Sequence, residues 1–227
     1  MPGLAERLAQ VKQEITAECS RLARPEPMLI VVTKNHPVEL AEQLAQLGER
    51  NFGENRVQEA ASKAADFNAN SPATEPHWHL IGQLQTNKVK QALEFASSIH
   101  SLDRDSLLDE LVKRTSTRET PLDVFIQVNL TDDEGRGGVQ TGSVLEFADR
   151  VSSVSTLKLK GLMAVASLDQ EPSADFETIA NLSEKLISNH PQASARSIGM
   201  SGDYLTALSF GATHLRIGTA ITGNRQL

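Results

Sequence analysis

The sequence alternates short apolar runs of β-forming residues with segments of helical periodicity. The predicted strands are Met28–Val32, Arg50–Phe52, His77–Ile81, Ser98–Leu102, Val124–Asn129, Leu157–Val165, Ala195–Ile198 and His214–Ile217. Helical segments lie between them, near residues 37–47, 54–66, 86–96, 104–117, 141–152, 173–189 and 203–210. This alternation is typical of parallel α/β folds. Eight strands predict a (β/α)8 TIM barrel, although a doubly wound sheet would give the same alternation.

An additional helix precedes the first strand. Apolar residues recur at helical spacing over about residues 3–23, at Leu4, Leu8, Val11, Ile15, Cys19 and Leu22. We expect this helix to pack on the barrel, with a partner protein as the alternative. Cys19 is the only cysteine, and on this face it is expected to be a core thiol rather than a nucleophile. No linker or change of composition divides the chain, so we expect residues 1–227 to form a single domain.

Composition excludes several classes of protein. Hydrophobic residues make up 39% and charged residues 22%, as in ordinary globular domains. The net charge of −7 argues against a nucleic-acid-binding surface, which would be basic. No apolar run has the roughly 20 residues that a membrane span requires, and the N-terminus lacks a secretory signal pattern. A single cysteine also forms no intramolecular disulfide, so we expect a cytoplasmic protein.

Lys34 is the first candidate functional residue. It directly follows the first predicted strand, and Asn35-His36-Pro37 come next, with a helix expected to start at about Pro37. In a TIM barrel, functional residues lie at the carboxyl ends of the strands. Partial dehydration at the mouth of a buried strand would favour the free amine, the nucleophile that forms a Schiff base with an aldehyde. The alternative is a surface lysine at a strand end.

The loops after the last two predicted strands carry small and hydroxyl residues. Ser201 and Gly202 precede a predicted helix, and Gly218 and Thr219 follow the eighth strand. TIM barrels often bind phosphate with these two loops, because free backbone N–H groups favour an anion. Arg216 lies two residues before Gly218, so the two share one face of the strand. A structural ion pair is the alternative role for Arg216.

An aldehyde-reactive lysine, a phosphate site and an arginine together suggest pyridoxal 5′-phosphate (PLP). Its aldehyde would bond to Lys34 and its pyridine nitrogen would face Arg216. Its phosphate would contact Ser201, Gly218 and Thr219.

Six segments, in order along nearly the whole chain, resemble the pyridoxal phosphate homeostasis protein family. They are Val31-Val32-Thr33-Lys34, Phe52-Gly53-Glu54-Asn55-Arg56-Val57-Gln58-Glu59, His77-Trp78-His79-Leu80-Ile81-Gly82-Gln83-Leu84-Gln85-Thr86-Asn87-Lys88, Gly161-Leu162-Met163-Ala164, Gly199-Met200-Ser201-Gly202-Asp203 and Leu215-Arg216-Ile217-Gly218-Thr219-Ala220-Ile221. The family has the alanine-racemase-like barrel without the second domain of the racemases.

The resemblance implies a PLP site and a role for each of its residues. Lys34 would carry the aldimine, Arg216 would contact the pyridine nitrogen, and Asn55 and Met200 would pack around the cofactor. The full implied set is Lys34, Asn55, Met200, Ser201, Arg216, Gly218 and Thr219. Family members bind PLP and influence vitamin B6 and amino-acid balance, and no robust catalytic turnover is generally attributed to them.

We therefore expect a PLP carrier or regulator that releases PLP to apo-enzymes or buffers its concentration. A complete barrel closes its own sheet, so a monomer is expected. A weak PLP-dependent amino-acid racemase is the alternative. The related racemases use a tyrosine from their second domain, whereas here the single tyrosine, Tyr204, falls on a predicted helix, and no second domain is expected after Gly218. A third possibility is an interaction protein for which PLP is a signal.

Some residues depart from the family pattern or carry other interpretations. The family often has lysine where this chain has Arg136, and an aromatic residue where it has Thr222. His77 and His79 have strand spacing and could bind a metal, but no third ligand is evident nearby, so no metal site is predicted. Glu54 and Glu59 are expected to be helix-start and surface carboxylates, although Glu54 falls close to the barrel mouth.

Overall fold

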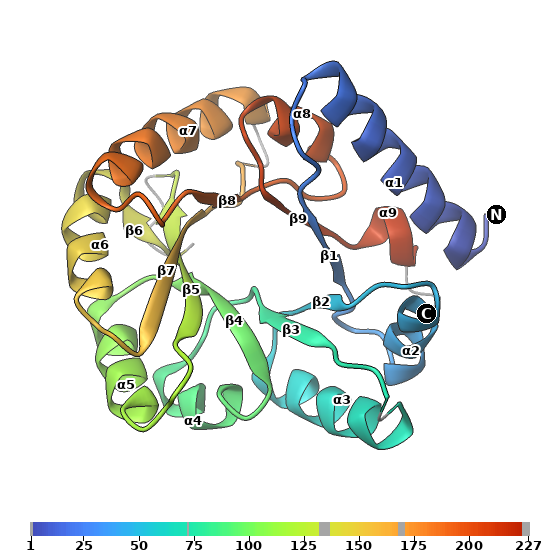
Figure 1. Ribbon diagram of the computed structural model, residues 1–227, viewed down its shortest axis with the longest axis horizontal. Coiled ribbons are helices and arrows are strands. Elements are labelled where there is room, and N and C mark those ends of the chain that lie inside the picture. The colour runs from blue at the N-terminus through green and yellow to red at the C-terminus, as the bar shows by residue number, and fades with distance from the viewer. Residues whose placement is uncertain (1, 72, 132–136, 168–170, 224–227) are drawn as a thin grey trace.

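Eight parallel strands form a closed barrel, which confirms the predicted (β/α)8 fold (Figure 1). The computed structural model describes residues 2–71, 73–131, 137–167 and 171–223. The barrel strands are β1 (Met28–Val32), β2 (Asn51–Glu54), β3 (His77–Leu80), β4 (Ala96–Leu102), β5 (Leu122–Asn129), β7 (Leu157–Met163), β8 (Ala195–Ser197) and β9 (His214–Ile217). Pairing of β1 with β9 and of β4 with β5 closes the ring. The carboxyl ends of all eight strands therefore meet at one end of the barrel.

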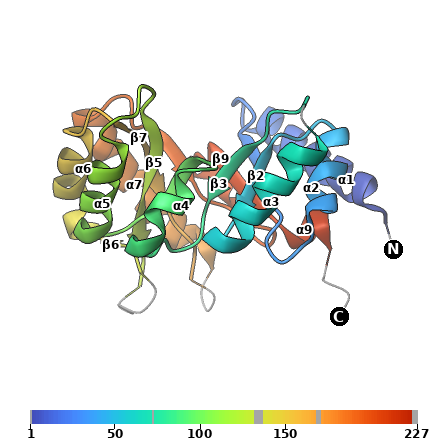
Figure 2. The ribbon, with the colours of Figure 1, turned by 90° about the horizontal axis from the view of Figure 1, so that it is seen from below.

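Helices surround the barrel on its outside (Figures 1 and 2). They are α1 (Leu4–Arg21), α2 (Val38–Gln46), α3 (Val57–Asn70), α4 (Val89–Ala92), α5 (Asp105–Thr115), α6 (Val144–Ser152), α7 (Pro172–Asn189), α8 (Tyr204–Ser209) and α9 (Thr219–Thr222), with single 3₁₀ turns at Thr86–Lys88 and Thr141–Ser143. None of the described helices is long and apolar enough to cross a lipid bilayer. The predicted N-terminal helix is confirmed as α1, which packs against α8 and α9.

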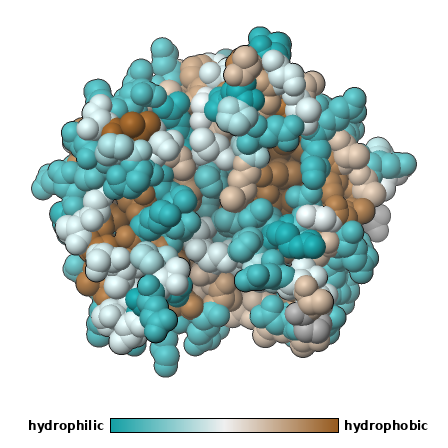
Figure 3. All heavy atoms as spheres, in the orientation of Figure 1, coloured by the Kyte–Doolittle hydropathy of each residue, from teal (hydrophilic) through white to brown (hydrophobic). Residues whose placement is uncertain are grey.

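The main hydrophobic core lies between the strands and the outer helices. Strand side chains alternate in direction, so Val31 and Phe52 face outward and are fully buried beneath helices. Phe52 packs against Phe67 of α3 and Trp78 of β3, with ring centroids 5.8 and 5.3 Å away. Cys19 is also buried on α1, and burial raises the pKa of its thiol. On the face seen in Figure 3, hydrophilic residues predominate, and apolar ones show between the outer helices and the strands.

Several boundaries differ from the sequence-based prediction. Strand β2 continues through Gly53 and Glu54, beyond its predicted end at Phe52, and α3 starts later than predicted, at Val57, and continues to Asn70. Glycine and glutamate are poor strand formers, so propensity ended the predicted strand too early. Pro37 is the N-cap of α2 rather than its first residue. The short strand β6 (Val139–Gln140), which pairs with β5, and helix α9 were not predicted.

Candidate functional site

A cavity of about 450 Å³ opens at the carboxyl end of the barrel. It is lined by Val32, Lys34, Asn55, Ile81, Val165, Met200, Ser201, Gly202, Arg216, Gly218 and Thr219. Every residue predicted to bind the cofactor lines this cavity. They come from the ends of four strands, β1, β2, β8 and β9, and parallel closure of the barrel brings them together. Cavities of this size commonly hold a small ligand or cofactor.

Lys34 lies on the loop between β1 and α2, and the residue is exposed. The prediction that it is partly dehydrated is therefore wrong. The strand beneath it is buried, but β1 ends at Val32, two residues before Lys34. The next residue, Asn35, has a left-handed backbone with φ of 61°, which turns the chain sharply after the lysine. Lys34 thus stands at the rim of the cavity, where its amine is accessible.

Ser201 connects the loops that follow β8 and β9. Its Oγ accepts hydrogen bonds from the backbone N–H groups of Gly218 and Ala220, both at 3.2 Å. Gly199 has a φ of +95°, and a Cβ there would lie 2.7 Å from Leu215, so glycine is required where this loop begins. These contacts gather a hydroxyl and two backbone donors at one side of the cavity.

Asp203 completes this loop by binding the backbone. Its Oδ1 accepts the N–H of Met200 at 2.5 Å, which holds Met200 at the cavity wall. Burial raises the pKa of the Asp203 carboxyl.

Arg216 is 3% exposed and projects from β9 into the barrel. Its Nη1 donates to the carbonyl oxygen and to Oγ of Ser197, the latter at 2.7 Å, and its Nη2 donates to the carbonyl oxygen of Ala164 at 2.8 Å. Among the described residues it forms no ion pair, so the interpretation as a structural ion pair is wrong. Burial lowers its pKa to about 10, and the charge of Asp203 opposes this shift. Arg216 therefore remains a cation at neutral pH.

A chain of buried polar side chains continues from Arg216 down the barrel interior. Ser197 Oγ lies 2.9 Å from His100 Nδ1, and Ser98 Oγ lies 3.0 Å from His100 Nε2 and 2.7 Å from His79 Nδ1. His79 Nε2 then contacts Asn51 Oδ1 at 3.1 Å. The sequence analysis did not predict this hydrogen-bonded network, although the alternation of Ser98, Ile99 and His100 indicates two polar side chains on one face of the strand.

Burial keeps His79, His100 and the neighbouring His214 neutral. It lowers the pKa of His79 to about 3 and that of His214 to about 4, and it lowers the pKa of His100 well below its usual value. His79 points into the barrel interior, whereas His77 is exposed. In the part of the chain that the structure describes, no group of three or more potential ligands could hold a metal ion.

Asn55 reaches the cavity because of a close backbone approach. A Cβ on Gly82 would lie 2.4 Å from the carbonyl oxygen of Asn55, so only glycine lets the loop after β3 pack there. Arg136, where the family pattern often has lysine, lies outside the described residues.

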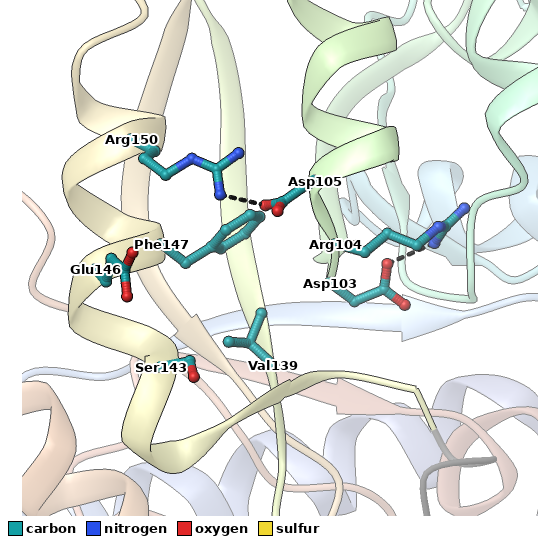
Figure 4. Close-up of a pocket in the computed structure, with 8 residues that line it drawn as sticks. All are labelled: Asp103, Arg104, Asp105, Val139, Ser143, Glu146, Phe147 and Arg150. Carbon is teal, nitrogen blue, oxygen red and sulfur yellow. Dashed lines mark hydrogen bonds and ion pairs between the residues drawn. The ribbon is translucent and has the colours of Figure 1, made fainter.

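A second cavity of about 340 Å³ lies between the start of α5, β6 and α6. Figure 4 shows two ion pairs among its charged side chains. Arg104 pairs with Asp103 and Arg150 pairs with Asp105, each at 2.5 Å. Phe147 and Val139 provide apolar surface between the two pairs. Because both arginines are neutralised by neighbouring carboxylates, this cavity is less suited to an anionic cofactor than the cavity beside Lys34.

Comparison with known proteins identifies relatives over the whole length of the chain. Residues 7–226 match the alanine racemase N-terminal domain family. A pyridoxal phosphate homeostasis protein of Vibrio cholerae is 36% identical, over 99% of this chain and 98% of the relative. The protein of the same name in Escherichia coli is 35% identical, over 99% and 98%.

Solved structures agree with these matches. PipY of Synechococcus elongatus, solved with PLP bound, is 32% identical with a TM-score of 0.85, over 97% of this chain and 100% of PipY. An alanine racemase of E. faecalis shares the fold, with a TM-score of 0.70 at 19% identity, over 94% of this chain and 57% of the racemase. The chain therefore belongs to the pyridoxal phosphate homeostasis protein family, within the alanine racemase N-terminal domains.

Proposed function

We propose that this protein binds PLP in the cavity beside Lys34 and acts in cellular PLP homeostasis as a carrier or regulator. The observation that carries the proposal is the convergence of an accessible amine, a hydroxyl with backbone donors and a buried cation in one cavity of about 450 Å³. The PLP-bound relative PipY, at 32% identity, supports it.

The donor groups of the cavity fit the chemistry of PLP. The hydroxyls of Ser201 and Thr219 are suited to phosphate oxygens, which are strong acceptors, and the N–H groups of Gly218 and Ala220 hold the Ser201 hydroxyl in place. Arg216 is fixed by Ser197 and Ala164 and lines the same cavity, so it can serve the pyridine nitrogen. Met200 and Asn55 would contribute packing around the cofactor.

Lys34 supplies the covalent link in this proposal. Its free amine would attack the aldehyde carbon of PLP and expel water to form a Schiff base, which water can later cleave. PLP itself supplies an aldehyde and, in enzymes, an electron sink. An exposed amine at the cavity rim is compatible with reversible attachment, because water reaches the bond.

A carrier is favoured over a racemase by the position of Tyr204. This is the single tyrosine of the chain, and its hydroxyl donates to Glu14 of α1, outside the cavity. Burial and the Glu14 carboxylate raise the pKa of this phenol. Tyr204 is thus unsuited to proton transfer on the cofactor. We extend the proposal to a cytoplasmic monomer that donates PLP to apo-enzymes.

The visible absorption spectrum of the protein with added PLP tests the proposal. We expect a yellow Schiff-base band in the wild type, trapped at Lys34 by borohydride and lost in Lys34→Ala. Lys90→Ala, on exposed α4 surface, is the matched control and should keep the band. An equal band in wild type and Lys34→Ala would refute the lysine assignment. Steady racemisation of an L-amino acid, abolished by Lys34→Ala, would replace the carrier with an enzyme.

A further inference from the structure

A buried cation lies directly behind Lys34. Lys63 projects from α3, and its side chain is only 4% exposed. Its Nζ donates to Glu54 Oε1 at 2.5 Å, to Glu59 Oε1 at 3.3 Å and to the carbonyl oxygen of Thr33 at 2.9 Å. A buried ammonium is costly unless it is paired and fully hydrogen-bonded, and here three acceptors surround it. Glu54 is therefore not a helix-start carboxylate as predicted, but a buried partner of Lys63.

This cluster holds both peptide bonds that flank Lys34. The carbonyl oxygen of Thr33, which accepts from Lys63, belongs to the peptide bond before Lys34. The N–H of Asn35, which donates to Glu59 Oε1 at 2.5 Å, belongs to the peptide bond after it. The backbone on each side of Lys34 is thus tied to the same ionic cluster.

Glu54 adds a third tie through the side chain of Thr33. Thr33 Oγ1 donates to Glu54 Oε1 at 2.7 Å, the same oxygen that pairs with Lys63. Glu54 Oε2 is buried without a hydrogen-bond partner among the described residues, so the contacts of this carboxylate converge on one oxygen. Burial raises the pKa of Glu54, and the hydrogen bonds from Lys63 and Thr33 oppose that shift.

We propose that Lys63 is a positioning residue that, with Glu54 and Glu59, clamps the backbone at Lys34 and so directs its exposed amine into the cavity. The proposal depends on the function proposed above for Lys34. An exposed lysine side chain has many rotamers, and fixing its Cα on both sides reduces the disorder that Schiff-base formation must overcome. The clamp therefore favours covalent attachment over non-covalent binding of PLP through its phosphate.

The first test removes the contact made by Glu59, the most exposed member of the cluster. Glu59→Ala deletes the acceptor for Asn35 and leaves the Lys63–Glu54 pair in place. We expect the fraction of bound PLP that borohydride traps at Lys34 to fall, and PLP release to become about fivefold faster, the effect of one lost hydrogen bond. Glu59→Gln should restore much of both, because its amide oxygen can still accept from Asn35.

A second variant and a matched control separate positioning from folding. Glu54→Gln with Lys63→Met removes both buried charges at similar volume, and we expect the same loss of trappable PLP. Glu49→Ala removes a carboxylate that pairs with Lys12 away from the cavity, and it should leave trapping and release unchanged. Melting temperatures of the PLP-free variants show whether each one folds.

The outcomes distinguish the two proposals. If Glu59→Ala and the double variant trap and release PLP as the wild type does, the clamp is overturned while Lys34 keeps its role. The same holds if total binding falls in step with melting temperature but the trapped fraction is unchanged. If the wild type itself is not trapped at Lys34, the proposed function fails and the clamp fails with it.

Discussion

The two sides of the candidate site are held by different kinds of force. On the Lys34 side, the buried pair of Lys63 and Glu54, together with the half-buried Glu59, holds the backbone through charged groups. On the Ser201 side, a neutral hydroxyl accepts from two backbone N–H groups. Buried charges depend strictly on their partners, whereas neutral hydrogen bonds exchange readily with water. The side proposed to make the covalent link is thus rigidly specified, and the side proposed to hold phosphate is adaptable.

The largest expected difference between the two sides is in stability. Glu54→Ala leaves the Lys63 ammonium buried without its closest carboxylate, and we expect a loss of about 3 kcal/mol in the free energy of unfolding. Ser201→Ala should cost about 1 kcal/mol, because it removes neutral hydrogen bonds from a partly exposed residue. Urea denaturation of the PLP-free proteins measures both. Equal losses would show that the buried charges are no more demanding than the hydroxyl.

A second difference is in the response to pH. The side that includes Arg216 continues into the neutral histidines of the barrel interior, with Lys160 and Arg216 among the charges near them. The pKa of His79 is lowered to about 3, so between about pH 6 and 4 the unfolded chain takes up a proton that the folded protein does not. The contribution of each such histidine to stability therefore falls as pH falls, by up to about 1.4 kcal/mol per pH unit.

Substitution of one histidine tests this directly. Glu54 and Asp203 act in the opposite direction, because their raised carboxyl pKa values favour the folded protein as pH falls. They are unchanged in His79→Gln, so the difference in slope between this variant and the wild type isolates the histidine. Urea denaturation from pH 7 to 4 should give a shallower dependence for His79→Gln. Parallel curves would mean that His79 is protonated in the folded protein.

These contrasts also explain which features the sequence predicts. The strand β1, the small residues after β8 and β9, and Lys34 follow from local pattern and from the general location of function in TIM barrels. Once the barrel closes, the predicted residues come together around one cavity. The ionic cluster cannot be predicted in this way, because Glu54 on β2 pairs with a lysine nine positions away on α3. Local sequence places a glutamate after a glycine at the start of a helix, and only the buried contact with Lys63 shows otherwise.

The polar interior of the barrel was also not predicted from the sequence. Ser98 and His100 both lie on β4, whereas Ser197 lies on β8, so the hydrogen bond between His100 and Ser197 exists only after the barrel closes. The prediction for Lys34 was wrong for a different reason. A buried strand suggested a dehydrated lysine, but β1 ends at Val32, and Lys34, two residues later, is exposed at the rim of the cavity. Burial at a strand end depends on where the strand stops, which local patterns locate least well.

On the Ser201 side, loss of the hydroxyl should weaken PLP binding about tenfold while Lys34 remains trappable by borohydride. Pyridoxal, which lacks the phosphate, should bind wild type and Ser201→Ala alike. Ser209→Ala, an exposed serine on α8, is the matched control. Spectroscopic titration with both compounds measures the effect. A Ser201→Ala variant that weakens pyridoxal as much as PLP would show that Ser201 does not serve the phosphate.

The smallest predicted effect concerns the contact between α1 and α9 on the outside of the barrel. Arg7 of α1 donates to the carbonyl oxygens of Ile221 at 2.6 Å and Thr222 at 3.2 Å, the last residues of α9. Helix α9 starts at Thr219, so α1 supports the Ser201 side from behind, through neutral carbonyls rather than buried carboxylates. Arg7→Met should therefore weaken PLP about threefold without reducing the fraction trapped at Lys34. Arg21→Met, which breaks an exposed pair with Glu18 on the same helix, should change neither quantity. If Arg7→Met instead lowers the trapped fraction, the two sides are coupled, and their separation into a rigid and an adaptable half fails.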